Sequence, residues 1–192
     1  MKNIFLYLFV GATFIFSTLS CNQKTKKADE ATANDKIENT SSEGSTANFS
    51  IQEMVSDYLT LKNALVADNS EAAAKAGKRL FETLNAVDIA IVPDDKKQEY
   101  KDITDDAKEN AEHIAKNEGN ITHQREHLVA LSKDINDLIV MFGTSQKLYQ
   151  IHCPMYNNGK GAIWISETDS IKNPYYGNGN KMFSCGIVKQ TF

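Results

Sequence analysis

The sequence predicts a mainly α-helical fold, in which an antiparallel four-helix bundle is followed by a small, irregular β-sheet region at the C-terminus. Two observations lead to this fold class. Between residues 49 and 143, apolar side chains recur every three or four positions, the spacing that places them on one helix face. After Gly143, short stretches rich in β-branched and aromatic residues alternate with Asn- and Gly-rich turns, as in a small sheet.

Boundary signals divide residues 49–143 into four helices. Ser50 and Glu53 have the spacing of a capping box, which predicts that the first helix begins there. Pro93 ends the second helix, because its ring disfavours helical backbone at the preceding residue. Gly119 lies in the turn before the fourth helix, and Gly143 ends that helix. Short connections make neighbouring helices antiparallel, as in an up-down bundle.

Three segments after the bundle have strand composition, namely residues 148–153, 162–166 and 187–192. Turn-forming Asn, Gly and Pro residues separate them. We expect residues 144–192 to form a small antiparallel sheet with long loops. We expect this segment to pack on the bundle and to form one domain with residues 49–143.

The first 21 residues have the pattern of a lipoprotein signal peptide. Lys2 supplies the positive charge, residues 4–16 form an uncharged apolar run, and small residues lead to Cys21. The run is shorter than the ~20 residues of a membrane-spanning helix. Thr18 departs from the usual lipobox leucine. We expect Cys21 to be lipidated and to anchor a periplasm-facing protein to the inner or outer membrane, with residues 22–48 as a disordered tether.

The composition argues against two other classes of function. The 192 residues carry a net charge of -4 with both signs mixed, so we expect no nucleic-acid partner. No nucleophile-elbow, P-loop or H-E-x-x-H motif is found. We therefore expect a binding protein rather than an enzyme.

Scarce sulfur side chains gather in two clusters about thirty positions apart. Cys153 and Met155 flank a proline after His152, and Met182 and Cys185 follow later. Thiolate and thioether donors favour soft ions such as Cu(I), and imidazole is a compatible partner. The alternative is a structural Cys153–Cys185 disulfide with the methionines packed around it, as an oxidising compartment favours.

Histidines supply possible nitrogen ligands. His123 and His127 are four positions apart on the fourth predicted helix, and His113 lies near the end of the third. Antiparallel packing around the turn at residue 119 would bring all three to one end of the bundle. His113, His127 and His152 are therefore candidate ligands beside the sulfur atoms, although histidines at a helix end are also commonly just solvated.

The C-terminal segment resembles an uncharacterised periplasmic domain family common in Bacteroidetes. The similarity lies in Cys153-Pro154-Met155, residues 161–166, residues 171–177, and Met182 with Cys185-Gly186, and it extends to parts of the first and fourth helices. Members of that family occur as lipoproteins and as domains appended to the adaptor proteins of copper and silver efflux pumps. The resemblance implies a role in heavy-metal handling.

These features lead to two hypotheses. The first is a lipid-anchored periplasmic protein that binds Cu(I) or another soft metal ion and buffers it or passes it to an efflux adaptor. The second is a non-catalytic protein-interaction module stapled by the Cys153–Cys185 disulfide. Thiol titration with and without Cu(I) separates the two.

Overall fold

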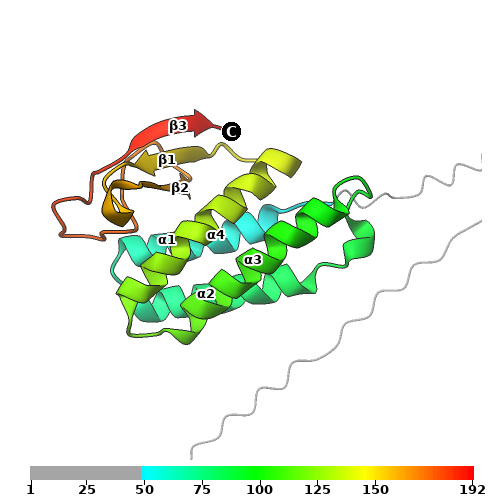
Figure 1. Cartoon of the computed structure of the whole chain (residues 1–192), viewed down its shortest axis with the longest axis horizontal. Coiled ribbons are helices and arrows are strands. Elements are labelled where there is room, and N and C mark those ends of the chain that lie inside the picture. Colours follow the sequence, from blue (N-terminus) through cyan, green and yellow to red (C-terminus); the bar gives the residue numbers. More distant parts are fainter. Residues whose placement is uncertain (1–48) are drawn as a thin grey trace, which may run out of the picture. The chain divides into compact units, whose positions relative to one another are not determined.

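The computed structural model describes residues 49–192, which form four α-helices and three strands. Figure 1 shows their arrangement. The predicted signal peptide, Cys21 and the tether lie outside the described residues. Within residues 49–192, no helix combines the length and apolar character that crossing a membrane requires. The elements, in chain order, are α1 (Gln52–Val66), α2 (Ser70–Ala86), η1 (Ile89–Ile91), α3 (Lys97–Lys116), α4 (Ile121–Phe142), β1 (Tyr149–Cys153), η2 (Asn157–Gly159), β2 (Ala162–Ser166) and β3 (Ile187–Thr191).

The helices pack in sequence order, α1 on α2, α2 on α3 and α3 on α4, and α1 also contacts α4. Their shared core holds fully buried leucines, isoleucines and alanines. Gly77 allows α2 and α3 to approach closely, since an added Cβ would lie 3.0 Å from the Ala111 carbonyl oxygen. The predicted fold class, four helices followed by a small antiparallel sheet, is confirmed.

Two predicted helix boundaries differ from the structure. No capping box forms at α1, where Ile51 is the N-cap and the Ser50 hydroxyl accepts from the Gln52 N–H at 3.2 Å. The Ile51 side chain is buried, so core packing rather than capping sets this terminus. Helix α2 ends at Ala86 instead of Pro93, because Val87 is extended and the chain then forms the η1 turn.

The sheet has the order β2-β1-β3, and both pairings are antiparallel, as predicted. Strand β2 packs against α4 and places Trp164 in the core. In β1 the residues alternate, so Ile151 and Cys153 are buried while His152 lies on the outer face. Strand β3 forms an exposed edge of the sheet.

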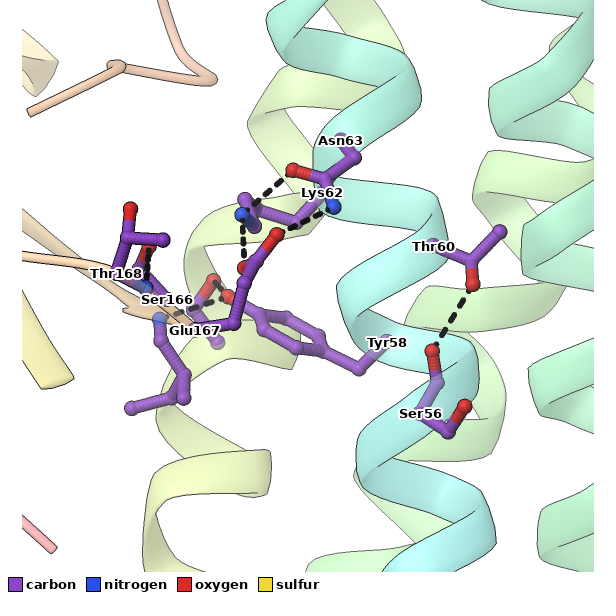
Figure 2. A network of polar contacts seen from close by, with 10 residues as sticks. Ser56, Tyr58, Thr60, Lys62, Asn63, Ser166, Glu167 and Thr168 are labelled. Carbon is purple, nitrogen blue, oxygen red and sulfur yellow. Dashed lines mark hydrogen bonds and ion pairs between the residues drawn. The ribbon is translucent and has the colours of Figure 1, made fainter. Parts of the chain in front are cut away.

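A polar network joins α1 to the end of β2 (Figure 2). The buried Lys62 ammonium donates to Glu167 at 2.8 Å and to Asn63 at 2.7 Å. Burial lowers the pKa of Lys62, and the Glu167 carboxylate opposes that shift. The Tyr58 hydroxyl lies 2.7 Å from the Ser132 hydroxyl and accepts from the Ile165 N–H at 3.2 Å. The network therefore fixes the sheet on α1 and α4.

Arg125 fixes the loop of residues 173–178 to the helix ends. Its guanidinium donates to the Leu65 carbonyl at 2.9 Å, to Asp68 at 2.5 Å and to the Pro174 carbonyl at 2.8 Å. Gly177 lies against this pair with φ +70°, a position where a Cβ atom would overlap Asp68 and Arg125. The C-terminal segment is thus held at the end of the bundle where α4 begins.

Candidate metal centre

Three histidines meet where α3 ends and α4 begins. His113 lies in the last turn of α3, His123 is near the start of α4, and His127 follows one turn later. One nitrogen from each ring lies within 4.8 Å of the others. Within residues 49–192 this is the one group of three histidine, cysteine or carboxylate side chains placed to hold a metal ion. The sequence prediction that these histidines gather at one end of the bundle is confirmed.

Hydrogen bonds fix the tautomers of two of the rings. His123 Nδ1 lies 3.0 Å from Oε2 of Glu126, and His127 Nδ1 lies 3.0 Å from Oδ1 of Asn110. The orientation of the Asn110 amide is set independently, because its nitrogen donates to the Asp106 carbonyl at 2.9 Å. Both Nδ1 atoms therefore carry the proton, and both Nε2 atoms present a lone pair when the rings are neutral.

The two Nε2 atoms face each other at 3.2 Å. Two neutral rings with this tautomer have no hydrogen between these atoms, so the lone pairs repel unless a cation lies between them. A proton or a metal ion removes this conflict. Two metal–nitrogen bonds of about 2.0–2.1 Å that meet at about 100° place their nitrogens about 3.2 Å apart. The observed separation fits a metal held by both rings.

Local electrostatics disfavour the proton. Burial, followed by repulsion from His113 and His123, lowers the pKa of His127. Metal ligands must be neutral imidazoles, so a lowered pKa favours metal over proton.

The third ring completes the group. His113 stacks on His127, with ring centroids 4.4 Å apart and planes at 18°. The His113 ring makes no hydrogen bond to another described residue. A small rotation of this partly exposed ring would bring its nitrogen to the other two.

A surface pocket of about 650 Å³ lies beside the triad. Glu126, the residue that holds His123, forms part of its wall. The remaining lining comes from the next two turns of α4 and from the chain after β1, namely Val129, Ala130, Lys133, Met155, Tyr156, Asn157, Asn158 and Tyr176. The chain after β1 therefore runs back along α4 to within one turn of the histidines.

The predicted sulfur ligands are arranged differently. Cys153 and Cys185 form a disulfide with Cα atoms 5.5 Å apart, as the interaction-module hypothesis assumes. In this oxidised form neither cysteine offers a thiolate to a metal. Met155 lies at the pocket wall with 59% of its surface exposed. Met182 lies in the turn of residues 181–184, where its N–H donates to the side-chain oxygen of Asn180.

His152 is separated from both groups. Its backbone pairs with Ile163 and Ile187 in the sheet, and its ring packs over Gly161 on the face opposite Cys153. Adjacent strand residues point to opposite faces, so His152 does not join the cysteine sulfur atoms. It belongs to no group of three potential ligands in the described chain.

The two side chains that orient the triad, Glu126 and Asn110, were not predicted from the sequence. His123 was predicted to lie beside the other histidines but was not among the candidate ligands. The signal for Glu126 and His123 was present as His123-Gln124-Arg125-Glu126-His127, which places both histidines and the carboxylate on one helix face. Asn110 carried no such signal, because its contact with His127 crosses from α3 to α4.

Residues 54–147 match a family described as Protein of unknown function (DUF3347). No curated protein and no solved structure matches the chain significantly. The matched region includes all three histidines of the triad and ends before β1, so it excludes the disulfide. The similarity to this family of unknown function therefore covers the helical part of the described chain.

Proposed function

We propose that this protein binds a first-row transition-metal ion through His113, His123 and His127. The observation that carries the proposal is the pair of facing Nε2 atoms at 3.2 Å, each left unprotonated by the hydrogen bond at the other end of its ring. Such a pair is a defect in a purely structural interface. It becomes a binding site once a cation with nitrogen affinity is added.

The donor set indicates the class of metal. Three imidazoles suit Zn²⁺, Cu²⁺ and Ni²⁺, whereas Cu(I) favours the sulfur ligands that the disulfide withholds. Copper thus stays among the candidate metals, in its divalent form at this site. The donors are partly exposed, which suits an ion that is exchanged rather than permanently enclosed.

The cellular setting is the second part of the proposal. A lipidated Cys21 would hold the domain at the periplasmic face of a membrane, where it buffers the ion or passes it to an efflux adaptor. The signal-peptide pattern of residues 1–21 and the family resemblance support this setting. Mass spectrometry of the membrane fraction tests it: an acylated N-terminal Cys21 is expected, and a soluble, unmodified chain would contradict it.

Calorimetric titration of the purified metal-free protein tests the site. We expect one Zn²⁺ or Cu²⁺ per chain, and we expect His127→Ala to weaken binding by more than about 100-fold, since loss of an outer-shell partner alone costs 10–100-fold. His152→Ala is the matched control, because its ring lies on the outer face of the sheet, and we expect unchanged affinity. Equal binding by the two variants would refute the assignment.

The disulfide supports a second candidate, a protein-interaction module. The Cys153–Cys185 bridge holds the loops around Tyr156 and Tyr176, whose rings lie 5.5 Å apart at the pocket. Thiol titration separates the two functions. Unreactive cysteines together with no metal uptake at the triad would favour the interaction module.

A further inference from the structure

The α4 segment around the triad has the spacing H-x-x-E-H. His123, Glu126 and His127 occupy positions i, i+3 and i+4, so all three side chains leave the helix on adjoining faces. In one class of metallopeptidase this spacing supplies two metal ligands and a general base. The spacing alone is weak, but here a third ligand from α3 and a pocket accompany it.

The donor count resembles that of a catalytic site. Structural zinc sites hold four protein ligands, whereas catalytic sites hold three and leave a position for water. The triad offers three donors, and the described part of the chain adds no fourth histidine, cysteine or carboxylate to the group. A metal at this site would therefore keep an open, solvent-reachable position.

Glu126 connects the triad to the pocket. Its carboxylate lies 3.0 Å from His123 Nδ1, and the same residue is the one acidic side chain that lines the 650 Å³ pocket. Its side chain is 61% exposed and makes no hydrogen bond to any other described residue. The carboxylate can therefore leave His123 and turn towards a water molecule at the triad.

The pocket suggests the class of substrate. Tyr156, Tyr176 and Val129 supply apolar and aromatic surface, and Asn157 supplies an amide for backbone groups. Lys133 lies seven residues beyond Glu126 on α4, about 10 Å at ~1.5 Å per residue. Three extended residues cover the same distance at ~3.3 Å each. The spacing fits a peptide whose free carboxylate pairs with Lys133 while an amide bond lies near Glu126.

We propose that the metal-loaded triad hydrolyses short peptides with a free C-terminal carboxylate, with Glu126 as the general base. This inference depends on the metal binding proposed above. A Zn²⁺ ion held by the three imidazoles would lower the pKa of a bound water molecule. The Glu126 carboxylate would take a proton from this water as its oxygen adds to the peptide carbonyl carbon. The C–N bond then breaks, and the leaving nitrogen takes the proton from Glu126. The acid product then passes its remaining proton to the amine, so the products are a carboxylate and an ammonium group, and no electron is transferred.

The test uses the full chain loaded with Zn²⁺ and quenched fluorescent peptides of mixed sequence, with free or amidated C-termini. We expect zinc-dependent cleavage. We expect Glu126→Gln to reduce kcat by about 10²–10⁴-fold, the range for general acid–base catalysis, while zinc affinity changes less than tenfold. The glutamine oxygen still accepts from His123 Nδ1, so a purely positioning residue would keep its activity. Glu118→Gln, an exposed acid in the turn before α4, is the control with no expected effect.

Lys133→Ala tests the substrate class. We expect KM for the free-carboxylate peptides to rise by up to about fivefold, and KM for the amidated peptides to stay unchanged. Zinc binding at the triad without cleavage would overturn this inference and leave the metal-binding proposal standing. Cleavage by Glu126→Gln at the wild-type rate would overturn the base assignment. Failure to bind zinc at all would instead refute the proposed function itself.

Discussion

The α3–α4 junction and the C-terminal sheet both bring scarce side chains together, but they leave these side chains in opposite states. In the sheet, Cys153 is buried and covalently paired with Cys185. At the junction, His123 and His127 are partly exposed, and two lone pairs face each other. Buried, covalently paired sulfur atoms stabilise a fold, whereas accessible nitrogen atoms with free lone pairs are available to a ligand. From this difference we infer that the disulfide stabilises the fold, and we propose the histidines as the functional site.

The largest effect that would sharpen this comparison is loss of the disulfide. Replacing both cysteines by serine should lower the free energy of unfolding by about 3–4 kcal/mol, from the chain entropy of a loop closed over 32 residues. Zinc affinity at the triad should stay within about threefold of wild type, because the bridge supplies no ligand. Urea denaturation and calorimetry measure the two quantities. A stable variant that loses zinc would reverse the two assignments.

The next effect concerns the anchor between the two regions. Arg125→Met should lower the free energy of unfolding by about 2–3 kcal/mol, less than for a fully enclosed ion pair, because the Asp68 side chain is 41% exposed. The guanidinium also satisfies the Leu65 and Pro174 carbonyls, so its loss should release the 173–178 loop. Hydrogen exchange should show faster exchange at the Gly177 and Asn178 amides. Unchanged protection there would show that Arg125 does not hold the loop.

Most of the secondary structure and the position of the histidines could be predicted from the sequence. The helices and strands followed from periodicity and turn residues, and strand 162–166 was predicted to the residue. The gathering of the histidines followed from antiparallel packing around one turn. These features depend on local patterns, which a sequence displays directly.

The tautomers could not be predicted in the same way. The proton positions depend on Asn110, whose amide is oriented by the Asp106 carbonyl on α3 while it contacts His127 on α4. The choice between thiolates and a disulfide also needed the distance between Cys153 and Cys185, which 32 residues of chain leave open. The start of α1 depended on core packing at Ile51 and not on the predicted capping box.

A smaller effect concerns the Asp134 carboxyl group, which lies two turns after His127 on α4. Asp134 has a buried oxygen without a partner among the described residues, and burial, followed by repulsion from Asp106 and Asp137, raises its pKa to about 7. Because the folded pKa lies above the unfolded value of 3.8, its contribution to stability is present at low pH and lost as pH rises through 7. Asp134→Asn should therefore stabilise the protein at pH 8 by up to about 1 kcal/mol, reduced by partial exposure. The gain should shrink as the pH falls from 7 and vanish only well below the unfolded value of 3.8, and a gain that stays constant across this range would refute the cause.

The smallest effect is the acid sensitivity of the metal-free triad. The pKa of His127 is lowered, so its contribution to stability is present above the unfolded value of 6.5 and lost as pH falls through the folded value. Between pH 7.5 and 5, the melting temperature of the wild type should therefore drop more than that of His127→Asn. The two drops should differ by less than about 2 °C. Parallel curves would show that the ring gains nothing from remaining neutral. Zinc should enlarge the difference, because protons compete with the metal.

The most direct test of the central claim is the state of the imidazole nitrogens during zinc titration, observed in long-range ¹H–¹⁵N spectra of the histidine rings. We predict that Nε2 of His123 and of His127 shifts to the metal-bound position, that both Nδ1 atoms stay protonated, and that His113 shifts with them at one zinc per chain. The ring of His152 should not change. Zinc-dependent shifts at His152, or none at His123 and His127, would contradict the account.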